Sequence, residues 1–200
     1  MKILSTIILI AASICCSESL RADFTLPTGF DTDLATSEST SFYYYSEQGD
    51  FIGQGQEVFL TPMDGNFNIN NNFDNGISVI TPGLLTSYNT SFAAPFQQLL
   101  EVGFLYEDAT RFPFQEDFEP GLSVSGDGRG CNTLTGQFQV IELEYDGSGN
   151  PIAFDAVFEQ HCEGATPALF GRIRFNASAV PEPSSSICVL GLFVLARRRR

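Results

Sequence analysis

GQFQVIELEYDGSGNPIAFDAVFEQHCEGATPALFGRIRFN, residues 136–176, has the clearest strand pattern in this sequence. Apolar side chains recur at every second position in its later part, a period typical of β-strands with one buried face. Asp146–Asn150 is rich in glycine and is followed by Pro151, which predicts a hairpin connection. Three consecutive strands are therefore expected: Gly136–Tyr145, Ile152–His161 and Ala168–Asn176.

The same alternation predicts which side chains face the core. Phe154 and Phe158 belong to the apolar set and are expected inside. Asp155, Arg172 and Arg174 fall in the opposite phase and are expected on the solvent face.

In the first of the three strands the phase slips between Val140 and Ile141, which predicts a β-bulge or a strand that changes sheets. Upstream, short apolar runs are separated by turn residues, as in a β-sandwich. Further strands are expected at Ser41–Ser46, Gln56–Thr61, Asn66–Asn70, Ile77–Thr81, Leu99–Tyr106 and Leu122–Ser125. Asp23–Thr40 is a leading segment or an irregular first strand, and a short helix is possible around Ala94–Leu100. The predicted fold is all-β, an antiparallel jelly-roll-like β-sandwich over residues 23–180.

Charge is strongly segregated along the chain. Residues 23–180 hold 22 Asp and Glu residues against four Arg and no Lys, a formal charge of −18, whereas the whole chain has −14. Such a domain repels phosphates and anionic lipid headgroups, so nucleic acid is not an expected partner. The acidity fits a solvated surface, with weak cation binding as the alternative.

The N-terminus, residues 1–22, has the anatomy of a secretory signal peptide. Lys2 is followed by a nearly unbroken apolar run to Cys16, and small residues lead to a cleavage point after Ala22, with Ser17/Ser19 as an alternative site. Lipoprotein processing at Cys15 or Cys16 is disfavoured, because neither cysteine follows a small residue. An N-terminal signal helix and export of the following domain are therefore expected.

The C-terminus, residues 181–200, has three parts in a fixed order. Pro181-Glu182-Pro183 is followed by a serine run, an apolar stretch Ile187–Ala196, and a terminal arginine cluster. The cluster comprises Arg197, Arg198, Arg199 and Arg200. Prolines keep the chain extended, the apolar stretch partitions into a bilayer as a short hydrophobic helix, and the arginines stay cytoplasmic by the positive-inside rule.

This tail resembles the PEP-CTERM sorting signals of Gram-negative and related bacteria, which a membrane-embedded exosortase recognises. The resemblance implies that Pro181, Glu182 and Pro183 form the recognition motif and that the segment after them is removed or exchanged. Ten apolar residues span only about 15 Å as a helix, against a hydrocarbon core of about 30 Å. A transient membrane insertion suits this length better than a permanent anchor.

Cysteine usage predicts one disulfide. Cys15 and Cys16 lie in the signal segment and Cys188 in the tail, which leaves Cys131 and Cys162 in the exported domain. An exported pair is best explained as a disulfide. The segments GDGRGCNTLTGQFQV and FEQHCEGATPALFGRIRFN resemble a module that recurs in exported bacterial proteins, and SEQGDFIGQGQ at Ser46–Gln56 resembles the opening of such a β-sandwich. The resemblance implies fold and export, not an activity.

The sequence argues against nucleophilic catalysis and against a metal site. His161 is the only histidine, and its neighbour Cys162 points to the opposite face of a strand, so a nucleophile–base pair is not expected. A serine triad lacks its Gly-x-Ser-x-Gly turn, and zinc lacks a ligand set at suitable spacing. Asp146, Ser148 and Asn150 alternate as in a calcium loop, but Pro151 replaces the required glycine, so a turn is favoured.

Carboxylate pairs and a tyrosine run provide the two remaining options. Glu142 with Glu144, and Asp155 with Glu159, share strand faces as the acids of a glycoside hydrolase would, although such pairs arise by chance in an acidic chain. Sugar could stack on tyrosines, with alternate members of the run buried. The tyrosines concerned are Tyr43, Tyr44, Tyr45 and Tyr88.

The sequence therefore predicts a non-catalytic exported protein of the cell surface or extracellular matrix, with no cofactor and no metal. Its maturation partners are a signal peptidase and an exosortase-type membrane enzyme. The alternative is a carbohydrate-binding module in contact with extracellular polysaccharide, and a glycoside hydrolase ranks third.

Overall fold

The computed structural model describes residues 24–85 and 87–179, so the expected signal helix and hydrophobic tail helix lie outside the described residues. Within these ranges the chain is mostly β, which confirms the all-β prediction. The helical elements there are α1 (Thr32–Thr36) and a 3-10 turn η1 (Pro95–Gln97). The strands are β1 (Ser41–Ser46), β2 (Glu57–Leu60), β3 (Asn68–Asn71), β4 (Ile77–Thr81), β5 (Tyr88–Ala93), β6 (Leu105–Arg111), β7 (Gly121–Gly126), β8 (Leu134–Tyr145), β9 (Pro151–Cys162) and β10 (Leu169–Phe175).

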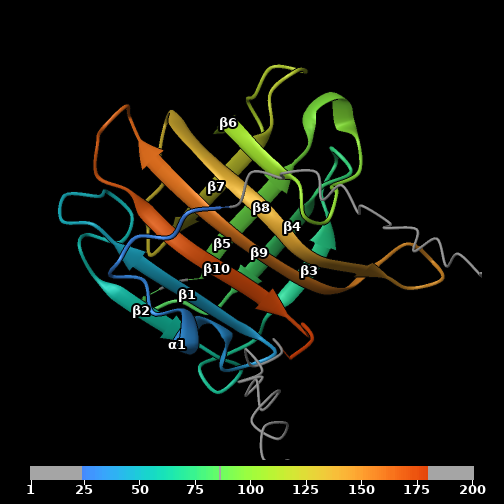
Figure 1. The fold of residues 1–200 in the computed structure, drawn as a ribbon, viewed down its shortest axis with the longest axis horizontal. Helices are drawn as coiled ribbons and strands as arrows, with labels where there is room; N and C mark the ends of the chain where they lie inside the picture. Colours follow the sequence, from blue (N-terminus) through green and yellow to red (C-terminus); the bar gives the residue numbers. More distant parts are fainter. Residues whose placement is uncertain (1–23, 86, 180–200) are drawn as a thin grey trace, which may run out of the picture.

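The strands form one hydrogen-bonded sheet in the order β2-β1-β10-β9-β8-β6-β7-β5-β4-β3. The sheet is curled, with β1, β10, β9 and β8 in front of β7, β5 and β4 in Figure 1. Neighbouring strands are antiparallel except β6 and β7, which pair in parallel over a short stretch.

Aromatic side chains fill the space inside the curl. Phe42 of β1 lies 5.2 Å from Tyr88 of β5, between ring centroids, and Phe92 of β5 lies 5.5 Å from Phe154 of β9. These strands are far apart in the sheet order, so the contacts show that the two halves of the sheet pack face to face. All four side chains are fully buried.

The hairpin and the bulge expected in the central segment are both confirmed. Asp146 closes the β8–β9 turn by accepting hydrogen bonds from the backbone N–H groups of Ser148 and Asn150, at 2.8 and 2.9 Å. The register between β8 and β9 shifts between Val140 and Glu142, so Ile141 is the extra residue and β8 stays in one sheet.

Two strands differ from the prediction. The expected strand Leu99–Tyr106 is wrong for most of its length, because the chain turns at Gly103 (φ 77°) and β6 begins only at Leu105. β5 was not predicted, although Tyr88, Thr90 and Phe92 alternate along it and point into the core.

The leading segment covers the outer face of β1 and β10. Asp31 caps α1 by accepting the N–H of Leu34 at 2.9 Å, and Phe30 lies edge-on to Tyr43 with ring centroids 4.8 Å apart. A second apolar cluster forms there from Phe30, Ala35, Tyr43, Ala168 and Phe170. β1 and β10 are therefore buried on both faces, and the segment is a cover with a short helix, not an irregular strand.

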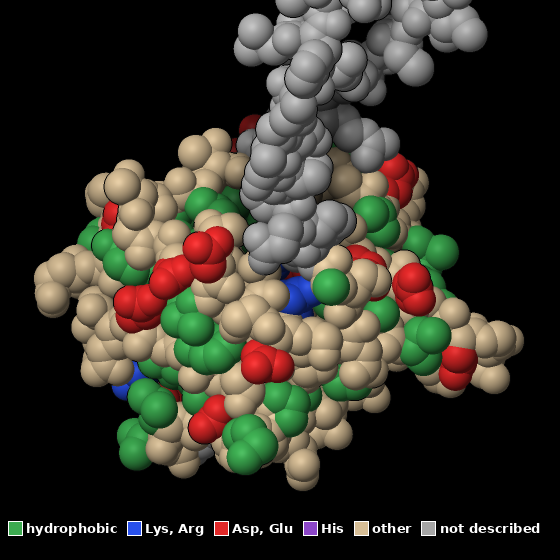
Figure 2. Space-filling model, turned by 60° about the horizontal axis from the view of Figure 1, so that its bottom comes forward, with side chains coloured by type: hydrophobic (Ala, Val, Ile, Leu, Met, Phe, Trp, Pro, Cys, Tyr) green, Lys and Arg blue, Asp and Glu red, His purple; other side chains and the backbone are tan. Residues whose placement is uncertain are grey.

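Among the charged side chains on the visible surface, acidic ones are far more frequent than basic ones. On the face shown in Figure 2 they are spread among polar and apolar groups, and basic side chains are scarce. Two of the four arginines of the domain, Arg172 and Arg174, are buried at 6% and 1% exposure, which removes half of its positive charge from the surface.

Candidate functional site

The prediction that Asp155, Arg172 and Arg174 face solvent is wrong. Asp155 is 2% exposed and forms a buried ion cluster with both arginines. Arg172 donates from Nε and Nη2 to the two carboxylate oxygens, at 2.8 and 2.7 Å, and Arg174 adds a bond from Nε at 3.1 Å. The cover formed by residues 24–40 takes this face out of water, and the bidentate geometry compensates the buried charges.

Arg174 also joins the two ends of the described domain. Its Nη1 donates to the carbonyl oxygens of Thr36, at 2.8 Å, and Glu38, and its Nη2 donates to the carbonyl oxygen of Ser178. A hollow of about 550 Å³ beside it is lined by residues of α1, the following turn and Ala179. Since Nε, Nη1 and Nη2 already donate to protein oxygens, this guanidinium is a structural clamp.

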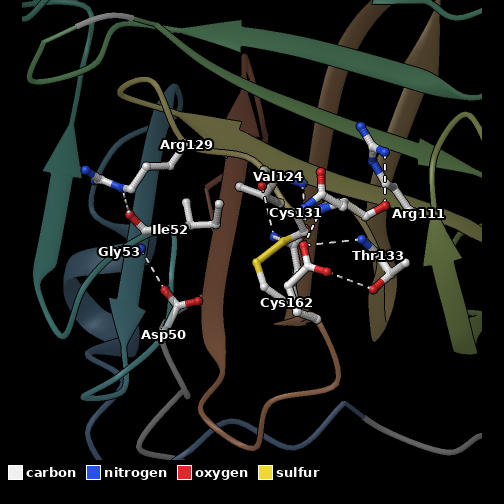
Figure 3. The surroundings of a disulfide bond; sticks show 12 residues. Asp50, Ile52, Gly53, Arg111, Val124, Arg129, Cys131, Thr133 and Cys162 are labelled. Carbon is white, nitrogen blue, oxygen red and sulfur yellow. Dashed lines mark hydrogen bonds between the residues drawn. A yellow bond between two sulfur atoms is a disulfide. The ribbon is translucent and has the colours of Figure 1, made fainter.

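The expected pairing of Cys131 with Cys162 is present, with the sulfur atoms 1.98 Å apart (Figure 3). Both cysteines are buried, and the bond joins the segment before β8 to the last residue of β9. Gln160 lies beside it, accepting the N–H of Val124 at 2.7 Å and donating to its carbonyl oxygen at 2.9 Å.

Glu163, the residue after Cys162, binds the segment that follows Cys131. It accepts hydrogen bonds from the backbone N–H of Asn132 and from the hydroxyl of Thr133, the latter at 3.1 Å. The Asn132 N–H is the main cause that lowers the pKa of Glu163 below its usual value. Arg111 donates to the Asn132 carbonyl oxygen at 3.0 Å, which completes a polar rim around a buried cross-link.

His161 and the candidate carboxylates have structural partners. His161 Nε2 lies 2.9 Å from Glu159 Oε1 on its own strand. The register places Glu142 opposite Asp155, but Glu142 accepts the N–H and hydroxyl of Ser178, at 2.8 and 2.9 Å, while Asp155 holds the two arginines. Glu144 is exposed. Glu142, Asp155 and Glu159 are thus each engaged by a side chain or backbone group of the domain.

The tyrosine platform is not available to a ligand. Tyr43, Tyr44 and Tyr88 are fully buried and Tyr45 is half-buried. Adjacent members of the run are both buried because the cover encloses one face of β1 and the curled sheet encloses the other. The Tyr44 and Tyr88 hydroxyls lie 2.9 Å apart, and Tyr88 donates to Asp127 at 3.0 Å. Burial raises the pKa of both tyrosines, with their mutual hydrogen bond as the next cause for Tyr88.

The best candidate site is a hollow of about 140 Å³ among three connections: β3–β4, β5–β6 and β6–β7. Hydrogen bonds tie these connections together. Phe96 N donates to the carbonyl oxygen of Asp117 at 2.6 Å, Asn75 Nδ2 to that of Gln97 at 2.8 Å, and Gln115 Nε2 to Asp74 Oδ2 at 2.8 Å. We call this hollow the three-loop pocket; its lining residues are Phe73, Asp74, Ala94, Phe96, Gln97, Pro113, Gln115, Glu116, Asp117 and Glu119.

The three-loop pocket combines exposed rings with acidic groups. Phe73 is 72% exposed and Phe96 is 65% exposed, whereas Asp74 is buried at 8%. Exposed large apolar side chains that gather at one hollow are typical of binding surfaces. Sequence reasoning missed this site because Asp74 and Gln115 are 41 positions apart and meet only through the β5–β7 pairing.

Metal-binding clusters and membrane-spanning helices are absent from residues 24–85 and 87–179. No group of three or more His, Cys, Asp or Glu side chains there lies close enough to hold a metal ion. No helix in these ranges is long and apolar enough to cross a membrane. The expected sorting residues Pro181, Glu182 and Pro183 and the cluster Arg197–Arg200 lie outside the described residues.

Comparison of the chain with protein-family models, with curated proteins and with solved structures finds no match.

Proposed function

We propose that this chain is a non-catalytic exported protein of the cell surface or extracellular matrix, sorted through its C-terminal tail by an exosortase-type enzyme. The observation that carries the proposal is the order of parts in residues 181–200: Pro181-Glu182-Pro183, a short apolar stretch, and a terminal arginine cluster. The tail inserts transiently in the membrane, and a signal peptidase removes residues 1–22.

Features of the domain support this proposal. A buried cross-link between Cys131 and Cys162 suits an oxidising compartment outside the cytoplasm. An acidic surface suits a protein that must stay soluble near anionic membranes. We also infer that the curled sheet is a jelly-roll-like β-sandwich, which the contact of Phe42 of β1 with Tyr88 of β5, two strands far apart in the sheet order, supports.

Mass spectrometry of the protein purified from its host tests the sorting proposal. We expect a mature N-terminus near residue 23 and a C-terminus altered after the Pro181–Pro183 motif. Replacing Pro181, Glu182 and Pro183 by alanine should leave the tail intact, whereas replacing Ser184–Ser186 by alanine, the matched control, should leave processing unchanged. Normal processing of the first variant would contradict the proposal.

Carbohydrate binding is the second candidate function. The observation that favours it is the three-loop pocket, where the exposed rings of Phe73 and Phe96 lie beside carboxylates and an amide. Aromatic faces and a few directed polar groups are the usual means by which a pocket orients a ligand. A glycan array probed with the purified protein tests this candidate, and an array without any bound glycan would rule it out.

A further inference from the structure

The three-loop pocket presents acceptors that lack donors. Asp74 is more than nine-tenths buried, and its Oδ2 accepts Gln115 Nε2 at 2.8 Å. The fully buried Oε1 of Gln115 accepts no hydrogen bond from the described residues. The other Asp74 oxygen, Oδ1, also accepts none from them, but it is not fully buried. A buried acceptor without a donor is costly, so Gln115 Oε1, with Asp74 as a charged acceptor next to it, marks a place where a donor from a ligand is favourable.

The charge around these acceptors has one sign. Glu116, Asp117 and Glu119 line the same pocket as Asp74, and its lining contains no Arg, Lys or His. A donor that also carries positive charge is therefore favoured over a neutral hydroxyl, because it forms charge-assisted bonds and is attracted by the local field.

Two phenyl rings border the acceptors. Phe73 and Phe96 are both mostly exposed, and Phe96 is held in the left-handed region with φ 57°. Gln97, the next residue, has φ 55°, so the backbone keeps an unfavourable conformation over two residues. The faces of such rings attract organic ammonium groups and pack on apolar C–H surfaces.

We propose that the three-loop pocket binds an amino sugar with a free, protonated amino group. The ammonium group donates to Asp74 and its acidic neighbours, while the apolar face of the sugar ring packs on Phe96 and Phe73. The choice of a saccharide as carrier rests on the proposed export into a surface or matrix, whereas the ammonium rests on the pocket itself.

The test is calorimetric titration of the protein, as it is purified from its exporting host, with a tetramer of glucosamine. The fully N-acetylated tetramer is the neutral comparison, because acetylation removes the charge and keeps the sugar rings. We expect binding of the free amine, no measurable binding of the acetylated form, and affinity that falls with added salt.

Two variants locate the binding. Asp74→Asn should weaken affinity about 10- to 100-fold, because one charged hydrogen-bond acceptor becomes neutral. Phe96→Gly should weaken affinity about tenfold through loss of the ring. Glycine also adopts the positive φ of position 96 without strain, so Phe96→Gly is expected to fold. This variant still tests the pocket if Asp74→Asn fails to fold.

Control variants remove a carboxylate charge or a phenyl ring elsewhere on the surface. Glu144→Gln removes an exposed carboxylate from β8, and Phe51→Ala removes a ring that is 51% exposed in the β1–β2 connection. Both should bind as the unchanged protein does. Equal loss in Glu144→Gln and Asp74→Asn would overturn the pocket, because the overall negative field would then explain binding.

Other outcomes also decide the proposal. Equal affinity for both tetramers, or none for either, overturns it even where mass spectrometry shows the expected processed ends, so the two proposals fail separately. If a lysine tetrapeptide binds as tightly as the glucosamine tetramer, the pocket recognises an ammonium group but not a sugar ring, and the amino-sugar proposal is wrong. The protein can also be titrated with calcium chloride. If calcium binds, and if Asp74→Asn abolishes this binding while Phe96→Gly leaves it unchanged, the pocket is a site for an inorganic cation and the amino-sugar proposal is wrong.

Discussion

At the scale of single residues, Asp155 shows how a period-two pattern can mislead. Its phase with Glu159 places it on the outer face of β9, and that face is covered by residues 24–40. The carboxylate then has two arginine partners and almost no contact with water. Alternation predicts on which side of a sheet a residue lies, but not whether that side is wet.

Asp155→Asn should destabilise the fold strongly. It leaves two buried guanidinium groups without a compensating charge, and breaking a buried ion cluster in this way costs about 3–5 kcal/mol. Urea unfolding followed by circular dichroism measures the loss. Glu144→Gln, on the exposed face of β8, is the control and should change the free energy of unfolding by less than about 0.5 kcal/mol. A similar small effect of both changes would show that the cluster is not desolvated.

Phe96→Gly should stabilise the protein in the absence of ligand. The ring is 65% exposed and contributes little burial, while glycine adopts φ 57° without strain. We expect the free energy of unfolding to rise by about 1 kcal/mol, measured by urea unfolding. Phe51→Ala, the control, removes an exposed ring without relieving such strain and should give no gain. A destabilised Phe96→Gly protein would show that the ring supports the fold instead of a ligand.

At the scale of elements, the sequence predicts well where one strand has one strongly alternating face. The β8–β9 hairpin, its bulge and β10 follow from such runs and from the turn chemistry of Asp146–Asn150. β6 was misplaced because the apolar run Leu99–Tyr106 contains a glycine turn that shifts the strand by several residues. The outer cover was missed because its apolar residues, Phe30, Leu34 and Ala35, are sparse within an acidic, serine-rich segment.

The candidate site was less predictable than the strands. The run of tyrosines in the sequence suggests a platform for sugar. Successive side chains of a strand point to opposite faces of the sheet, however, and both faces of β1 are covered by other parts of the domain. The three-loop pocket comes from connections that are distant in sequence, and the pairing of β7 with both β5 and β6 brings them together. The signal in the sequence that could have indicated this pocket is the presence of single phenylalanines in turn segments.

The disulfide that joins the segment before β8 to the end of β9 gives a prediction about stability. Breaking the Cys131–Cys162 bond releases a loop with a sequence separation of 31 residues, and the chain-entropy model gives a loss of about 3–4 kcal/mol. Reducing agent should therefore lower the melting temperature. The double variant Cys131→Ser with Cys162→Ser should show the lower value without reductant and no further response to it. An unchanged midpoint under reduction would contradict a bridged pair.

At the scale of the whole molecule, the buried tyrosines set the alkaline limit of stability. Burial raises the pKa of Tyr44, Tyr88, Tyr106 and Tyr145 above the usual value. A tyrosine that holds its proton more tightly in the folded state contributes its full stability below the unfolded pKa of about 10 and loses it as the pH rises toward the folded pKa.

The free energy of unfolding should therefore fall above about pH 10, by about 1.4 kcal/mol per pH unit for each such tyrosine. Tyrosinate absorbance and circular dichroism should change together, because these groups ionise when the chain unfolds. Tyr88→Phe removes one of them, so its stability should fall less steeply with alkaline pH. Ionisation of all tyrosines well before unfolding would contradict the burial of their hydroxyls.

The first strand of the sheet lies beside the last, since β1 pairs with β10 from Ser41 to Ser46, and Arg174 reaches the carbonyl oxygen of Thr36 across 138 positions. A chain that crosses a membrane N-terminus first delivers β1 long before the strand that completes its pairing. During that interval β1 has an open edge and an uncovered aromatic face, the condition in which chains associate with each other or with a holding chaperone. Under the proposed export, translocation speed sets how long the chain is at risk of aggregation, and an insertion in the exposed β8–β9 turn would lengthen that time without altering the finished core.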